Sequence, residues 1–193
     1  MTRIPAPPET LSQVGRAAHD LGLAGLLGGY LFGRMALHPA VASISDPRER
    51  GEVVNAAWRR YGVINSLSLA AVVAGWAGAR AAEAADANLS PRERRLARAK
   101  DALVASVFAC GTASAIEGVR FSRQAPHGAV PLADGTHPGP DTPPAAARLK
   151  RRVNALGLAT MASEAGLVAV NAALNQATFR QPPVRRRIPR LAR

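Results

Sequence analysis

The sequence predicts an all-α protein, a four-helix transmembrane bundle with long helices, a proline-rich loop between the third and fourth helices, and a basic C-terminal tail. The first observation behind this is segment 61–79, which holds no Asp, Glu, Lys, Arg or His and is bordered by Arg60 and Arg80. A helix of that length rises about 28 Å, close to the thickness of the hydrocarbon core of a bilayer. The second is a set of capping residues followed by prolines, and the third is a net charge of +12 that gathers between and beyond the apolar segments.

The first helix is expected over 10–38, because Pro39 disfavours helical geometry in the residue before it. Its apolar centre, 21–33, is short for a membrane span and has the length of the apolar region of a signal peptide. Residues 40–42 also resemble a small-residue cleavage site. Glu9 and Asp20 precede the apolar centre and Arg34 follows it, so we expect a retained span rather than a cleaved leader.

Three glycines of this helix, Gly25, Gly29 and Gly33, recur every four residues and therefore share one face. Small residues at this spacing let a second helix backbone approach closely, which favours helix association in lipid. We expect this face to be a helix-packing surface.

The remaining helices are expected over 47–84, 91–121 and 143–178. Asp46 with Pro47, Ser90 with Glu93, and Thr142 with Pro143 give each a capping residue at its start. The expected spans are about 18–38, 60–80, 101–121 and 153–175. They lie in one membrane domain, 10–179, between a flexible N-terminus, 1–9, and the basic tail, 180–193.

A cluster of polar residues is expected at membrane depth: Arg34, His38, Asn65, Glu117 and Glu164. From the rise of a helix, Arg34 and Glu117 lie about 20 and about 22 Å from the same membrane edge, and Glu164 lies near the midplane. Charged groups at this depth seek a partner, so we expect Arg34 to pair with Glu117. The pair would fix helix register or handle an ion, proton or substrate; the alternative is that the charged side chain snorkels to the membrane interface. Glu164 would act as a proton relay or as a hydrogen-bonding group between helices.

The 124–142 loop is rich in proline and is expected to be an extended excursion outside the membrane. His127, Asp134, His137 and Asp141 carry metal-binding side chains, but their spacing matches no defined ligand motif. We therefore expect no metal and no other cofactor, and we regard the loop as a possible partner surface.

The basic residues flank apolar segments, and aromatic residues make up only 4% of the chain. This pattern favours the lipid bilayer as partner, with anionic headgroups bound at the tail, and argues against nucleic acid. The distribution of Lys and Arg predicts a multi-pass protein of the plasma membrane with both termini in the cytoplasm. A protein partner or a homo-oligomer is a further expectation.

The glycine-rich first helix ending in LFGRMALHPAV, followed by WRRYGVINSLSL, resembles small four-span bacterial integral membrane proteins of unknown function. The resemblance implies a membrane location and a helical bundle, and it supplies no catalytic residues. The sequence shows no nucleotide-binding loop, zinc signature or nucleophile elbow. We expect a structural or interaction subunit rather than an enzyme. The alternative is a small transporter or membrane enzyme that uses Arg34, Glu117 and Glu164.

Overall fold

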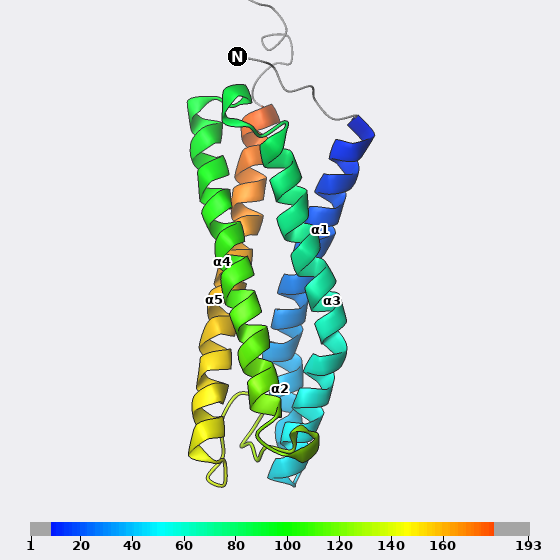
Figure 1. Ribbon diagram of the computed structural model, residues 1–193, viewed down its shortest axis with the longest axis vertical. Coiled ribbons are helices and arrows are strands. Elements are labelled where there is room, and N and C mark those ends of the chain that lie inside the picture. The colour runs from blue at the N-terminus through cyan, green and yellow to red at the C-terminus, as the bar shows by residue number, and fades with distance from the viewer. Residues whose placement is uncertain (1–8, 180–193) are drawn as a thin grey trace, which may run out of the picture.

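The computed structural model describes residues 9–179 and shows four long helices side by side (Figure 1). The predicted all-α fold is confirmed for these residues, in which the extended structure is an isolated bridge between Leu132 and Pro138. The expected flexible segment 1–9, apart from Glu9, and the basic tail 180–193 lie outside the described residues. The elements are α1 (Glu9–Phe32), η1 (Gly33–Leu37), α2 (His38–Ala40), η2 (Val41–Ser43), α3 (Pro47–Ala81), η3 (Asp86–Asn88), α4 (Pro91–Ser122), η4 (Pro126–Gly128) and α5 (Pro144–Phe179).

Two helix starts follow the local capping chemistry. Asp46 accepts a hydrogen bond from the backbone of Arg48 at the start of α3, and Ser90 forms a capping box with Glu93 at the start of α4. The expected capping role of Thr142 was wrong. Its hydroxyl instead donates to the carbonyl of Pro131 and accepts from the amide of Gly139, so it ties the preceding loop together.

The first helix does not end at His38 as predicted, but continues through Pro39 to Ser43. It does so by widening into a π-helical turn, in which the amide of His38 donates to the carbonyl of Gly33. Proline lacks an amide proton, and its ring clashes with the carbonyl four residues earlier. The wider turn accommodates Pro39 without breaking the rod.

The four rods form two closely packed pairs. Helix α1 packs mainly along α3, α4 packs mainly along α5, and the two pairs meet less extensively. The buried core between them contains Leu26, Val72, Val107 and Leu167. We call the contact between the α1/α3 pair and the α4/α5 pair the seam.

Three helices, α3, α4 and α5, are long and apolar enough to cross a membrane. Each contains an apolar stretch of 18 residues, the apolar window, in which only 11%, 22% and 17% of residues, respectively, are buried within the protein. Large apolar side chains therefore lie on the outside of the bundle, on α1 and η1 as well as on the other three long helices: Leu21, Phe32, Met35, Val63, Leu67, Phe108, Ile116 and Val168.

The 124–142 loop folds back onto one end of the bundle, at the bottom of Figure 1. Val130 and Leu132 are buried, so the loop packs against the bundle and is not extended as expected. Arg50 donates hydrogen bonds to the carbonyls of Ile44 and Ala133, at 2.7 and 2.8 Å. The loop thus closes this end of the bundle with its own small apolar core.

Candidate functional site

Glu164 lies on α5 in the interior of the bundle and is fully buried. Neither of its carboxyl oxygens has a hydrogen-bond partner among the described residues. Tyr30 of α1 interacts electrostatically with Glu164, and its hydroxyl lies among Ser114 of α4 and Thr160 of α5. The centre of the bundle is therefore polar across the seam, with one carboxyl group that lacks a partner.

The predicted pairing of Arg34 with Glu117 is not observed. Oε1 of Glu117 binds Nη1 of Arg120 at 3.1 Å, one turn away on the same helix, while Arg34 is exposed. Asn65 is half-buried on α3. Helical rise gives the depth of a residue but not the side of the rod on which it lies, so residues at one level need not meet.

His38 connects three parts of the structure at the closed end. Its Nε2 accepts a hydrogen bond from Nε1 of Trp58 at 3.1 Å, its Nδ1 lies 3.2 Å from the hydroxyl of Thr136, and its carbonyl accepts from the amide of Gly135. Because Trp58 can only donate, Nε2 is the acceptor and Nδ1 carries the proton. His38 thereby holds the 124–142 loop against α1 and α3.

The three spaced glycines of the first helix lie against α3. A Cβ atom at Gly25 would lie 2.5 Å from the Ser68 hydroxyl, and Cβ atoms at Gly29 and Gly33 would overlap the rings of Tyr61 and Trp58. The Tyr61 hydroxyl also donates to the carbonyl of Gly25. The absence of side chains at these positions allows large aromatic residues of α3 to approach the backbone of the first helix.

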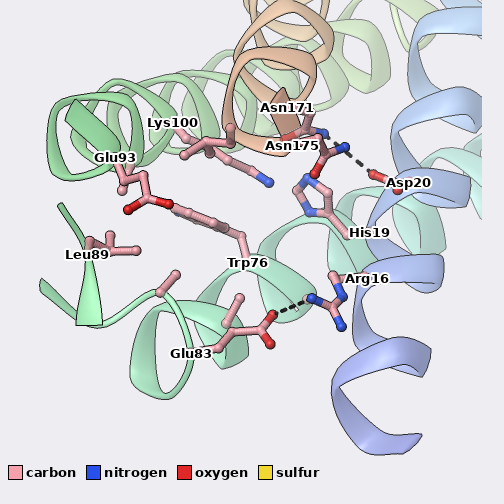
Figure 2. Close-up of a pocket in the computed structure, with 15 residues that line it drawn as sticks. Arg16, His19, Asp20, Trp76, Glu83, Leu89, Glu93, Lys100, Asn171 and Asn175 are labelled. Atoms are coloured by element: carbon pink, nitrogen blue, oxygen red, sulfur yellow. Dashed lines mark hydrogen bonds and ion pairs between the residues drawn. The ribbon is translucent and has the colours of Figure 1, made fainter. Parts of the chain in front are cut away.

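A cavity of about 220 Å³ lies at the opposite end of the bundle, where α1 begins and α5 ends. Figure 2 shows its polar lining, to which all four long helices contribute: Arg16, His19, Asp20, Trp76, Glu83, Glu93, Lys100, Asn171 and Asn175. Arg16 pairs with Glu83 at 3.3 Å, and Asn171 donates to Asp20 at 3.4 Å. Apolar side chains complete the wall: Ala79, Leu89, Ala97 and Leu174.

Lys100 is the most unusual residue of this cavity, because only 7% of its surface is exposed. Its Nζ lies 4.2 Å from the centre of the Trp76 ring, a cation–π contact. Burial lowers the pKa of Lys100 to about 8, against the opposing effect of the nearby Asp20 carboxylate.

His19 is also buried, and its Nδ1 lies 2.8 Å from the backbone carbonyl of Val72. A carbonyl can only accept, so Nδ1 carries a proton, and Nε2 is an acceptor in the neutral ring. No described residue forms a hydrogen bond with Nε2. The cavity therefore holds a buried lysine, whose Nζ contacts an aromatic ring, and a buried acceptor that has no partner among the described residues.

The histidines and aspartates of the 124–142 loop do not converge. Asp134 and His137 form a local pair at 2.8 Å, and within residues 9–179 no three His, Cys, Asp or Glu side chains are placed to hold a metal ion. Burial raises the pKa of the Asp134 carboxyl, but hydrogen bonds from His137 and the Thr136 amide outweigh it and keep that pKa below its usual value. This pair belongs to the folding of the loop.

No protein-family model, curated protein or solved structure matches this chain. The function must therefore be argued from the geometry.

Sequence reasoning missed the cavity. Its residues come from four separate segments, and their spacing along the chain follows no motif. One signal was present: His19 and Asp20 stand immediately before an apolar segment, and Lys100 and Asp101 stand immediately before another. Because α1 and α4 run in the same direction, both boundaries lie at the same end of the bundle (Figure 1).

Proposed function

We propose that the protein is an integral membrane protein whose four long helices cross the bilayer and that it serves there as a structural or interaction subunit. The observation that carries the membrane location is the exposure of the apolar windows of α3, α4 and α5. A soluble monomer rarely exposes contiguous apolar surface of this extent. Contact with lipid tails would remove these apolar side chains from water, whose contact with apolar surface is unfavourable.

The fourth span in this proposal is the first helix. It packs along α3 for much of its length and carries exposed apolar residues at Leu21, Leu31, Phe32 and Met35. The location is the plasma membrane with both termini in the cytoplasm, supported by the distribution of Lys and Arg along the chain. Anionic lipid headgroups at the basic tail, a protein partner and a homo-oligomer remain part of the proposal.

The non-enzymatic role is supported by what the polar residues do. His38 holds the 124–142 loop, Glu117 pairs with Arg120, and Arg50 binds backbone carbonyls. Each of these side chains is used to position other parts of the protein. A structural role therefore explains the contacts of these three side chains without a reaction on a substrate.

The experiment is membrane fractionation of the full chain. We expect the protein in the membrane pellet after washing with alkaline carbonate and high salt, and in solution only after detergent extraction. Recovery of a monodisperse protein from the soluble fraction without detergent would refute the proposal. Release by high salt alone would indicate a surface-bound protein, which also contradicts it.

A second function, proton handling, is favoured by one observation: the fully buried Glu164 carboxyl has no partner for either oxygen among the described residues. Intramembrane ionisable residues of this kind mark proton pathways. The test is proton flux in proteoliposomes that contain the wild-type protein, the Glu164→Gln variant or the Glu117→Gln control. Flux lost only in Glu164→Gln supports this function. No flux with wild type, or equal flux in all three, refutes it.

A further inference from the structure

The cavity between the starts of α1 and α4 and the ends of α3 and α5 is lined by a buried lysine and a buried histidine (Figure 2). Lys100 is 7% exposed, and its Nζ lies 4.2 Å from the centre of the Trp76 ring. Nε2 of His19 is buried without a hydrogen-bond partner among the described residues. Buried polar groups are normally hydrogen-bonded, so an unpartnered Nε2 beside a buried lysine indicates that something else supplies contacts in this cavity.

Opposite charges also face each other there without meeting. The Asp20 carboxylate acts electrostatically on Lys100, yet the two form no ion pair, and Asp20 receives only a long hydrogen bond of 3.4 Å from Asn171. In Figure 2 the Lys100 side chain points toward His19, with Asp20 beyond the ring. A molecule between them would meet a cation on one side and two acceptors on the other.

We propose that this cavity binds a small zwitterion, a phosphate or carboxylate group joined by a short chain to a primary ammonium. The anionic group accepts hydrogen bonds from Lys100. The ammonium donates to Asp20 and to Nε2 of His19. The apolar wall around Trp76 covers the connecting carbon atoms.

The size of the cavity agrees with such a ligand. A volume of about 220 Å³ corresponds to about seven water molecules at about 30 Å³ each. An ethanolamine phosphate group or a small amino acid occupies a comparable space. A bare anion fits less well, because Glu83 and Glu93 also line the cavity and would repel it.

Two sources can supply this chemistry. The cavity lies near the end of the bundle, with Asp20 two residues inside the expected 18–38 span and Lys100 one residue before the expected 101–121 span. Lipid headgroups would be found near this level, so one source is the headgroup of an ethanolamine phospholipid. The other is a soluble zwitterion from the adjoining aqueous compartment. The soluble source does not depend on the membrane proposal, so the two ideas can fail separately.

The test uses the fluorescence of Trp76 in the purified full chain in detergent micelles. The chain has two tryptophans, so a Trp58→Phe background leaves Trp76, which lines the cavity, as the reporter. Phosphoethanolamine and glycine are the zwitterionic probes, and inorganic phosphate and ethanolamine supply each charge alone. We expect a saturable emission change with at least one zwitterion, at roughly tenfold lower concentration than with either single ion.

Lys100→Met and Asp20→Asn should each weaken binding by roughly tenfold or more, since each removes a charged hydrogen-bonding partner. Asp20 is exposed, so its variant keeps the test valid if Lys100→Met does not fold. The matched control is Lys150→Met, which removes a second buried lysine, also stacked on an aromatic ring, at the other end of the bundle. The control should bind like the background protein.

The proposal is overturned if neither zwitterion gives a saturable change, if inorganic phosphate binds as well as phosphoethanolamine, or if both cavity variants bind unchanged. Binding of the soluble probes to the protein in nanodiscs of different lipid composition identifies the natural source of the ligand. Discs that contain phosphatidylethanolamine, but not phosphatidylglycerol alone, should block the soluble probes if the ligand is a lipid headgroup. Equal binding of the probes in both kinds of disc assigns the site to a soluble zwitterion.

Discussion

Replacing Glu164 with methionine should make the protein more stable. Glu164 is fully buried, and its two carboxyl oxygens have no hydrogen-bond partner among the described residues. Methionine has a similar length and flexibility, is apolar, and is as favourable as glutamate in a helix. The substitution therefore removes an unsatisfied polar group while keeping the volume of the side chain.

The size of the effect follows from that burial. A buried polar group without a partner costs about 1–3 kcal/mol, and replacing buried ionic groups with well-packed apolar ones often stabilises a protein by about 1–4 kcal/mol. We expect Glu164→Met to raise the free energy of unfolding by about 1–3 kcal/mol.

Glu93 provides the matched comparison. It is also a buried glutamate in a long helix, but its Oε2 accepts a hydrogen bond from the Ser90 amide at 2.9 Å in the capping box. Loss of a cap costs about 0.5–2 kcal/mol, so Glu93→Met should lower the free energy of unfolding. The same substitution at two buried glutamates is thus expected to have opposite signs.

The assay is reversible unfolding of the purified protein in mixed micelles, followed by helical circular dichroism as a denaturing detergent is added. Loss of stability in Glu164→Met comparable to that in Glu93→Met would refute the reasoning, because it would mean that the Glu164 carboxyl is satisfied in the folded protein. If Glu164→Met is more stable than the wild type and also abolishes proton flux, the lower stability of the wild type is explained by a functional role of the Glu164 carboxyl.

The other predictions concern helix packing and the 124–142 loop. Gly29→Leu should destabilise the protein by about 1–3 kcal/mol in the same unfolding assay, because a Cβ there overlaps the Tyr61 ring, whereas Gly28→Leu, with no neighbour within 4 Å, should change stability by less than about 0.5 kcal/mol. Arg50→Met should cost about 1.5–3 kcal/mol and speed proteolytic cleavage of the loop, since its charged hydrogen bonds to backbone carbonyls are lost. The folded-state pKa of Asp134 is lowered, so its stabilising effect is present above pH 3.8 and is lost as the pH falls through the lower folded-state value. Proteolysis of the loop by an acid-active protease should therefore quicken at low pH in the wild type, and an Asp134→Asn variant should show a smaller pH dependence.

The features that the sequence predicted well are those that neighbouring residues determine. The starts of α3 and α4 depend on a cap and a proline within a few residues, and both begin where the capping chemistry places them. Thr142 has the same local pattern, but its hydroxyl bonds to Pro131, eleven residues earlier. Pro39 likewise predicts a helix end, and the chain instead widens into a π turn.

The contacts of the polar residues show more clearly that features set by distant parts of the chain are not predictable from local sequence. Depth along each rod is predictable from the helical rise, and it placed Arg34 and Glu117 at one level. Which residues meet depends on the rotation of each rod about its axis, and that is fixed by packing elsewhere in the bundle. Glu117 consequently forms its ion pair with Arg120 of the same helix. The cavity depends on the rotation of four rods at once, so no local pattern contains it.

The two sites described above, the buried Glu164 and the cavity around His19 and Lys100, share one feature: residues of both interact with the other helix pair. Tyr61 and the Gly25 carbonyl bond within the α1/α3 pair, and Ser106 and Ser163 bond at 2.8 Å within the α4/α5 pair. Lys100 interacts electrostatically with Asp20 across the seam, and Glu164 with Tyr30 across it. Each pair thus has polar contacts of its own, while Nε2 of His19 and the Glu164 carboxyl, which have no hydrogen-bond partner among the described residues, belong to residues that interact electrostatically across the seam. A ligand at the cavity would supply contacts to both pairs, so occupancy of the cavity would oppose their separation along the seam.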